Sequence, residues 1–158
     1  MKWNLLQLIA VILLCQAAGG LGAIFTAKAI PVWYAGLRKP SFNPPNWVFG
    51  PVWTLLYTLM GIALYRVWKL DPQTAGRSLG LLLFFIQLGL NALWTPLFFG
   101  LHALWPAFVE ILLMWAAILL TAARFYQLDP VSAWLLAPYL AWVTFAGLLN
   151  FAYAKLNP

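Results

Sequence analysis

The sequence predicts an all-α, polytopic membrane protein, a bundle of five transmembrane helices forming one domain over residues 1–158. Hydrophobic residues make up 65% of the chain and charged residues 8%, whereas soluble domains contain about 45–50% and about 25%. A soluble domain of this size could not bury so much apolar surface. The few charges also delimit long uncharged runs, and a membrane-spanning helix needs about 20 apolar residues. Residues 79–86 do not alternate apolar and polar, which excludes a β-barrel.

The first span is expected near residues 4–26, inside the uncharged run between Lys2 and Lys28. A basic start followed by an apolar run also resembles a signal peptide. The run continues through Phe25, longer than a usual signal core, which favours a retained helix. Its second half contains two overlapping pairs of small residues, which permit close approach of another helix or a ligand: Ala18, Gly19, Gly22 and Ala23.

The connection over residues 27–45 is the long one of the chain, and we expect it to act as a lid over a pocket. Four prolines stiffen it, and Trp33, Tyr34 and Phe42 make it too apolar for a solvated linker. Long connections of this kind are often lids or binding loops. The alternative is an interfacial segment whose rings lie at headgroup depth.

The other spans are expected near residues 46–65, 79–99, 103–123 and 131–153. An uncharged run of 32 residues covers the third and fourth, which is too long for one span, and residues 98–102 supply a break inside it. Pro51 and Pro106 fall in first helical turns, where a missing N–H costs little. Pro96 and Pro138 lie deeper and are expected to kink or loosen their helices.

Charge and cysteine content exclude several classes of site. The nine Lys and Arg residues give a net charge of +6, but they divide almost evenly between the two faces, so the positive-inside rule assigns no orientation. We interpret them as membrane anchors and expect no nucleic-acid partner. A single cysteine excludes an internal disulfide and a cysteine-based metal cluster, and no metal site is expected. Short loops and the lack of a separate targeting segment favour a bacterial envelope membrane, with the mitochondrial outer membrane as the eukaryotic alternative.

Polar side chains inside membrane spans are costly and therefore informative. In the third span, Gln87, Asn91 and Trp94 are spaced so that they share one helical face. The second and fifth spans carry similar stripes of rings, small or apolar residues and an amide: Trp53, Tyr57, Met60, Tyr139, Trp142, Ala146 and Asn150. Single amides more often join helices than bind ligands, but flat rings with a few polar groups predict a pocket for an amphipathic, ring-shaped ligand. Glu110, an acid well inside the fourth span, is a further candidate.

Three motifs follow one another along the chain. They are Trp33-Tyr34-x-x-Leu37-x-Lys39-Pro40-x-x-x-Pro44-Pro45-x-x-x-Phe49-x-x-x-Trp53-x-x-Leu56-Tyr57, then Gln87-x-x-x-Asn91-x-x-Trp94-x-x-x-Phe98-Phe99-Gly100, then Pro138-Tyr139-x-x-Trp142-x-x-x-Ala146-x-x-Leu149-Asn150. In this order, and over nearly the whole chain, they resemble the translocator protein family, also called tryptophan-rich sensory proteins or peripheral-type benzodiazepine receptors.

The resemblance implies a five-helix membrane fold, usually homodimeric, with a ligand pocket beneath the first loop. It also implies ligands such as protoporphyrin IX and other tetrapyrroles, sterols, and benzodiazepine- or isoquinoline-type compounds. By motif position, Trp53 and Trp142 match the pocket tryptophans implicated in porphyrin photodegradation by some bacterial members. Together with the pattern above, the expected ligand-binding residues are Trp53, Asn91, Trp142, Ala146, Ala23, Tyr57, Gln87, Trp94, Trp33 and Glu110.

A sterol motif overlaps the end of the last span. Leu149-x-x-x-Tyr153-x-Lys155 satisfies a pattern proposed for sterol contact, although many helices match it by chance. Tyr153 and Lys155 are also ordinary interfacial anchors.

Three functions stay open at this point. The leading hypothesis is a membrane receptor or carrier that binds porphyrins, with sterols and benzodiazepine-type compounds as further ligands and no cofactor. The second is an enzyme that degrades porphyrin in light and oxygen. The chain has no hydrolytic constellation, but redox chemistry through Trp53 and Trp142 is possible, because an excited porphyrin supplies the energy. The third is a regulatory membrane protein acting through a protein partner. The expected partners are a porphyrin or other tetrapyrrole, a sterol, membrane lipid and a second copy of the chain.

Overall fold

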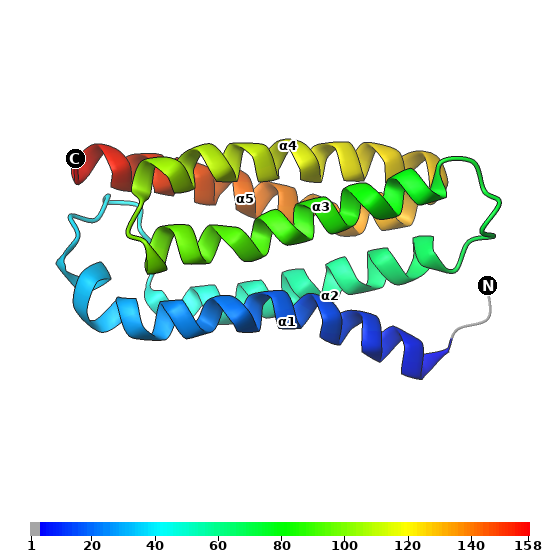
Figure 1. Ribbon diagram of the computed structural model, residues 1–158, viewed down its shortest axis with the longest axis horizontal. Coiled ribbons are helices and arrows are strands. Elements are labelled where there is room, and N and C mark those ends of the chain that lie inside the picture. Colours follow the sequence, from blue (N-terminus) through cyan, green and yellow to red (C-terminus); the bar gives the residue numbers. More distant parts are fainter. Residues whose placement is uncertain (1–3) are drawn as a thin grey trace.

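The computed structural model describes residues 4–158, so Lys2 lies outside the described part. Five long helices run through it (Figure 1): α1 (Leu5–Ala29), α2 (Phe49–Trp68), α3 (Arg77–Thr95), α4 (Leu104–Leu128) and α5 (Pro130–Leu156). Each belongs to a helical segment long and apolar enough to cross a membrane, and the described residues contain no strand. The predicted all-α fold with five spans is confirmed.

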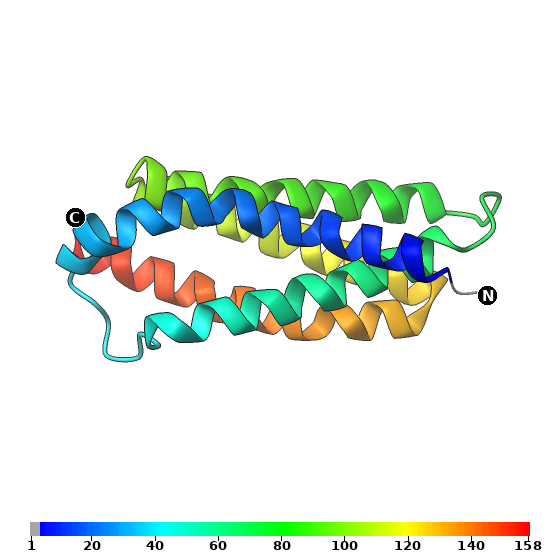
Figure 2. The ribbon, with the colours of Figure 1, turned by 90° about the horizontal axis from the view of Figure 1, so that it is seen from below.

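The helices are arranged as a closed ring. Around the ring the order is α1, α2, α5, α4 and α3, and α3 packs back against α1. The two views of the ribbon show the helices roughly parallel or antiparallel, with the described N-terminal residues at one end of the bundle and the C-terminus at the other (Figures 1 and 2). We call these the N-terminal end and the loop end, because the connection between α1 and α2 lies at the latter. A ring of this kind encloses an axis that side chains either fill or leave hollow.

The first span extends further than the sequence analysis placed it. Helical structure continues beyond α1 through the wide turn η1 (Ile30–Tyr34), so the first part of the expected lid over residues 27–45 is helix. Pro31 would break an ordinary α-helix because it lacks an N–H and crowds the preceding turn. In η1 the Ala35 N–H donates to the Ile30 carbonyl instead, and such wider turns accommodate an irregular residue without ending the helix.

The other prolines lie where helices begin, end or continue. Pro96 opens a second wide turn, η3 (Pro96–Gly100), and the chain then reverses at His102, whose φ of 55° is left-handed. The change of direction therefore falls within the expected break at residues 98–102. Pro138 lies inside α5, which continues on both sides of it.

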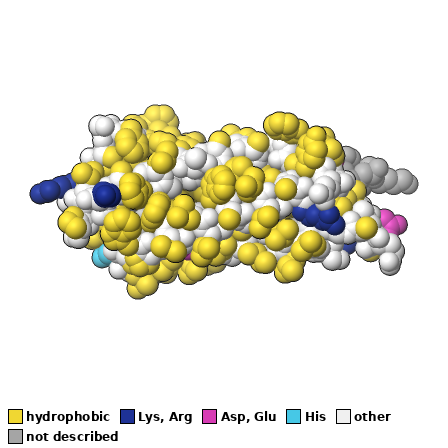
Figure 3. Space-filling model, turned by 90° about the horizontal axis from the view of Figure 1, so that it is seen from above, with side chains coloured by type: hydrophobic (Ala, Val, Ile, Leu, Met, Phe, Trp, Pro, Cys, Tyr) yellow, Lys and Arg dark blue, Asp and Glu magenta, His cyan; other side chains and the backbone are white. Residues whose placement is uncertain are grey.

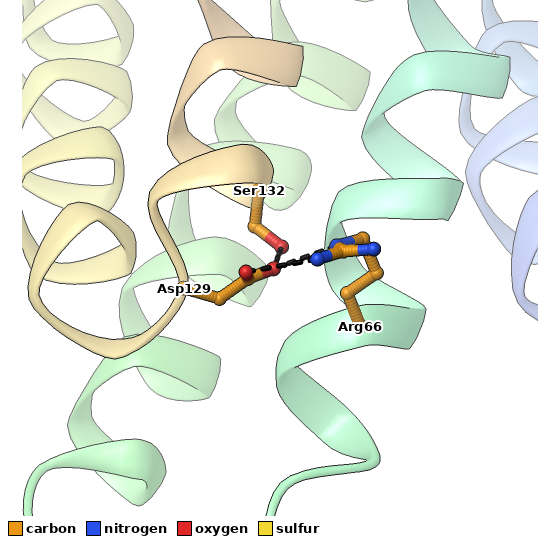
Figure 4. A network of polar contacts seen from close by, with 3 residues as sticks. All are labelled: Arg66, Asp129 and Ser132. Atoms are coloured by element: carbon orange, nitrogen blue, oxygen red, sulfur yellow. Dashed lines mark hydrogen bonds and ion pairs between the residues drawn. The ribbon is translucent and has the colours of Figure 1, made fainter. Parts of the chain in front are cut away.

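The N-terminal end of the bundle is closed by an ion pair between α2 and the junction of α4 with α5 (Figure 4). Arg66 donates from Nε and Nη2 to the two carboxylate oxygens of Asp129 at 2.7 and 2.9 Å, and the Ser132 hydroxyl donates to the same carboxylate. The Arg66 guanidinium is the main cause that holds the pKa of Asp129 below its usual value. Two parallel charged hydrogen bonds fix the relative orientation of the groups they join.

The axis of the N-terminal half is filled by large side chains. Tyr65, Phe84 and Phe125 have no exposed surface, and the rings of Phe84 and Phe125 stack at 5.9 Å. The backbones of α1 and α2 meet at Gly61, where a Cβ atom would lie 2.7 Å from Ile12 Cα. Among the described residues, large side chains thus fill the axis of this half of the bundle.

Candidate ligand-binding site

A cavity of about 590 Å³ occupies the loop-end half of the bundle. All five helices contribute to its wall, α4 through Ile111 and Met114. Its volume falls within the range of about 300–1,000 Å³ typical of small-molecule sites. Charged side chains are absent from its lining residues. A ligand inside it therefore meets rings, amides and hydroxyls but no fixed charge.

A chain of buried hydrogen bonds forms the inner end of the cavity. The Tyr57 hydroxyl donates to Asn91 Oδ1 at 2.5 Å, and Asn91 Nδ2 donates to the Tyr139 hydroxyl at 3.0 Å. The ring of Trp53 stacks on that of Tyr57 at 5.3 Å. One amide thus joins α2, α3 and α5, and Tyr57 and Asn91 both line the cavity. Asn91 makes a helix–helix bond and at the same time shapes the wall.

A second amide joins three helices nearer the loop end. Trp94 Nε1 donates to Asn150 Oδ1 at 3.0 Å, and Asn150 Nδ2 donates to the Leu104 carbonyl at 2.9 Å. The indole of Trp94 is therefore fixed against α5, and Trp94 also lines the cavity. The indole N–H of Trp142, another lining residue, is buried and has no hydrogen-bond partner in the described residues. This nitrogen has almost no accessible surface, so the ring of Trp142 lines the cavity and its N–H does not.

The connection between α1 and α2 closes the loop end, and only the segments at its two ends line the cavity. Tyr34 and Tyr153 line it, and their hydroxyl oxygens lie 2.7 Å apart. Asn43 Oδ1 of the connection accepts hydrogen bonds from this pair, at 2.8 Å from the Tyr153 oxygen. The Arg38 N–H donates to Asn157 Oδ1, just after α5, at 2.9 Å, and Asn157 Nδ2 donates to the Arg38 carbonyl at 3.1 Å. The expected lid, residues 27–45, thus lines the cavity through Ala27, Ile30 and Tyr34, whereas residues 35–45 supply none of the lining.

The cavity opens sideways between α1 and α2. The lining residues that are exposed, rather than half-buried or buried, all belong to α1, to the short turn η2 (Asn46–Val48) or to α2: Gly20, Ala23, Ala27, Asn46, Gly50 and Thr54. On α1 these residues are small, so the two helices leave a gap between them. Toward the N-terminal end Gln16 closes the gap, because its Nε2 donates to the Thr54 carbonyl at 2.9 Å.

The structure brings most of the expected ligand-binding residues to this cavity. Seven of the ten line it: Trp53, Asn91, Trp142, Ala146, Ala23, Tyr57 and Trp94. Gln87 and Glu110 are buried away from it, and neither side chain has a hydrogen-bond partner in the described residues. Trp33 lies outside the lining and stacks on His102 at 4.1 Å. Two residues of the sterol motif, Leu149 and Tyr153, line the cavity, and the third, Lys155, is exposed.

Sequence reasoning missed part of the lining. Gln16 and Thr26 on α1, and Ile111 and Met114 on α4, line the cavity without having been singled out. The α1 residues were detectable, because polar and small residues recur there every three or four positions from Gln16 to Ala27, which marks one face of a helix. The α4 residues carry no such signal, since an apolar residue in a span is equally typical of packing.

The fold defines a multi-pass integral membrane protein whose five helices surround a cavity. The chain belongs to the TspO/MBR family, whose model matches residues 11–156. It is 47% identical to tryptophan-rich protein TspO of Archaeoglobus fulgidus over 98% of this chain and 99% of that protein. It is 48% identical to the human translocator protein over 79% of this chain and 75% of that protein, and 43% identical to protein CrtK of Rhodobacter capsulatus over 91% and 88%. The resemblance seen in the sequence is thereby confirmed.

Proposed function

We propose that the chain is a membrane receptor or carrier that binds porphyrins in the cavity, with protoporphyrin IX as the representative ligand. The observation that carries the proposal is the lining: an uncharged cavity of about 590 Å³ whose wall includes the indoles of Trp53, Trp94 and Trp142. Flat rings bury a flat macrocycle over a large area, and a few polar groups fix its orientation. Sterols and benzodiazepine-type compounds, which are also largely apolar and ring-shaped, are further ligands of the same cavity under this proposal.

The two propionates of protoporphyrin IX set how it would lie. A carboxylate is costly to bury in an uncharged site, so the propionates stay outside the wall described above. The loop end supplies cations for them: Lys39 Nζ lies 4.8 Å from the ring centroid of Tyr34, a lining residue. We expect the macrocycle between the tryptophans and the propionates toward Lys39.

The test is a titration of the detergent-purified protein with protoporphyrin IX in the dark, followed by the absorbance of the porphyrin. Trp142→Phe reduces the ring area that lines the cavity, and we expect it to weaken binding about tenfold, the effect of losing about 50 Å² of apolar contact at about 25 cal/mol per Å². Trp134→Phe is the matched control, because Trp134 is 71% exposed on the outside of α5. Unchanged affinity in a folded Trp142→Phe variant would show that the ligand binds elsewhere.

Light-dependent porphyrin degradation is the second candidate. It is favoured by the placement of Trp53 and Trp142 on one cavity, with Trp53 stacked on Tyr57 at 5.3 Å. Tryptophan and tyrosine can supply an electron to an excited porphyrin, with oxygen as the co-reactant. Illumination in air should then give a defined product that Trp53→Phe no longer forms, while dark binding persists. Fading of the porphyrin at the same rate in wild type and variant would reject the enzymatic reading.

A homodimer in an envelope membrane completes the proposal. Relatives from prokaryotes match over 86–100% of their own length and the mammalian translocator proteins over 71–83%, which favours a prokaryotic envelope, such as the bacterial one, over the mitochondrial outer membrane. Light scattering of the purified protein, corrected for detergent, distinguishes a dimer from a monomer.

A further inference from the structure

A second hollow lies on the outside of the bundle, between α4 and α5. It measures about 420 Å³ and is lined by Phe108, Ile111, Leu112, Trp115, Val143, Thr144, Gly147, Leu148 and Phe151. Figure 3 shows the molecule from the α4 side: apolar side chains cover the middle of this face, and Lys or Arg side chains lie toward both ends. We call this hollow the α4–α5 groove. It opens on the outside of the bundle and shares Ile111 and Val143 with the wall of the inner cavity.

Two features keep the α4–α5 groove open. Gly147 at its floor has no side chain, and a Cβ there would meet only Ile111 Cγ2, at 3.8 Å. Trp115 is held upright, because its Nε1 donates to Thr144 Oγ1 at 2.8 Å, and Thr144 donates onward to the Leu140 carbonyl at 2.8 Å. The polar groups of the groove are thus satisfied by the protein itself. The space that remains suits an apolar occupant that needs no hydrogen bond.

The position of the groove along α5 matches one leaflet of a bilayer. Thr144 lies near the middle of α5 (Pro130–Leu156), and eleven residues separate it from Lys155, which is about 16 Å at the helical rise of about 1.5 Å per residue. The hydrocarbon core of a bilayer is about 30 Å thick. The groove therefore extends from the bilayer centre to the headgroup region at the loop end, the length of one acyl chain.

A cation stands where the headgroup of such a lipid would lie. Lys155 is exposed, and its Nζ lies 5.6 Å from the ring centroid of Phe151, which lines the groove. Trp105, an exposed ring 6.0 Å from Phe151, is typical of side chains at headgroup depth. The loop end also carries Lys28, Arg38 and Lys39, whereas Asp71 and Asp129 lie at the N-terminal end and Glu110 is buried within α4. The exposed charges at this end of the groove are therefore positive.

We propose that the α4–α5 groove binds one acyl chain of an anionic phospholipid, whose phosphate is held by Lys155. The apolar groove requires the chain, and the unpaired positive charge at its end selects a negative headgroup over a zwitterionic one. A sterol would fill the groove equally well but would gain nothing from Lys155, because its hydroxyl is uncharged. The cation therefore favours the phospholipid.

The test is native mass spectrometry of the detergent-purified protein with dioleoyl phosphatidylglycerol, dioleoyl phosphatidylcholine or cholesterol added. We expect one phosphatidylglycerol to be retained about fivefold more strongly than phosphatidylcholine, the contribution of one interfacial lysine. Lys155→Gln should abolish this preference and leave weak binding of both lipids. Lys69→Gln, which removes an N-terminal-end cation bonded to Gln7, should leave the preference intact.

The apolar half of the proposal is tested separately. Gly147→Val fills the groove floor, and we expect weaker retention of both phospholipids, while dark binding of protoporphyrin IX shows that the variant is folded. Glycerol 3-phosphate, a headgroup without chains, should not displace the retained lipid. The proposal is wrong if Lys155→Gln keeps the preference, if wild type retains both phospholipids equally, if cholesterol displaces phosphatidylglycerol at equal concentration, or if glycerol 3-phosphate competes.

Discussion

The N-terminal half of the bundle is filled and the loop-end half is hollow, although the same five helices run through both. In the filled half, large rings such as Phe84 and Phe125 stack across the axis, and α1 touches the α2 backbone at Gly61. In the hollow half, α1 presents small residues such as Gly20 and Ala23 to the gap beside α2. The difference is one of side-chain volume, because a ring of helices has the same width wherever its members stay parallel. A cavity here needs only small residues on one helix.

Polar groups are used differently in the two halves. At the N-terminal end the Arg66–Asp129 pair is complete, with two charged hydrogen bonds. In the hollow half, Asn91 is fully used between two tyrosines, but the indole N–H of Trp142 stays unpaired. Buried donors without partners are costly, and Gln87, which lies outside the cavity, also has none among the described residues. The filled half holds the helices together, and the hollow half contains the cavity in which we propose binding.

The largest effect expected from this comparison is loss of stability in Gly61→Ala. A Cβ at this position would lie 2.7 Å from the backbone atom Ile12 Cα, so α1 and α2 must separate. Overpacking of this kind costs about 1–3 kcal/mol, although alanine recovers about 1 kcal/mol of helix propensity. Thermal unfolding in a mild detergent, followed by circular dichroism, measures the change.

Gly89→Ala is the matched control for that experiment. Gly89 also lies within a helix, and a Cβ there meets nothing within 4 Å, so the variant should be as stable as wild type or slightly more stable. Equal stability of the Gly61 and Gly89 variants would mean that the filled half tolerates expansion. The contrast between the two halves would then not lie in packing.

Gly19→Ala should change ligand binding more than it changes the free energy of unfolding. A Cβ there would lie 2.3 Å from Tyr57 Cε2, but a ring can rotate into the cavity where a backbone atom cannot move. The Tyr57–Asn91 hydrogen bond would be lost and the wall displaced. We expect dark binding of protoporphyrin IX to weaken about tenfold, as for one lost buried hydrogen bond. Gly20→Ala, with no atom within 4 Å, is the control, and similar affinities for the two variants would contradict the rigid wall inferred here.

A smaller effect is expected for Asp129→Asn, which neutralises the ion pair of the filled half. The two side chains are 24% and 15% exposed, so solvent screens them in part, and the loss at neutral pH should be about 1 kcal/mol. The pKa of Asp129 is lowered in the folded protein. Its stabilisation is therefore present above the unfolded value of about 3.9 and is lost as the pH falls through the folded pKa.

The measurement is thermal unfolding of wild type and Asp129→Asn at pH 7 and at steps down through pH 3. The difference between the two should shrink at the acid end of the series. Asp71→Asn serves as the control, since within the described part of the chain that carboxylate accepts a local bond from the Gln73 N–H and forms no ion pair. A difference that stays constant over the whole series would show that the ion pair does not carry it.

The five spans and much of the site could be predicted from the sequence, and the parts that were not predicted have identifiable physical reasons. Uncharged runs locate spans because charge in a bilayer is costly, and helical spacing placed Asn91 and Trp94 on one wall. Gln87 shares that face but lies one to two turns nearer the filled half, beyond the cavity, which spacing alone does not reveal. The first span was placed near residues 4–26 because Lys28 ends the uncharged run, whereas the helix continues past Lys28 into the wide turn η1. Ile111 and Met114 were indistinguishable from packing residues.

The smallest effect, and the sharpest test of how charge is divided between the halves, is expected for Lys39→Gln. The cavity wall has no charge, so the propionates of protoporphyrin IX must find their partners at the loop end, where Lys39 lies over the Tyr34 ring. An exposed ion pair contributes about 0.2–1 kcal/mol, which predicts binding about two- to fivefold weaker. Protoporphyrin IX dimethyl ester has no such charges, so its affinity should be the same in wild type and variant, and Lys69→Gln at the opposite end should affect neither ligand. An equal loss for acid and ester would mean that Lys39 supports the wall through Tyr34 rather than the ligand through its charge.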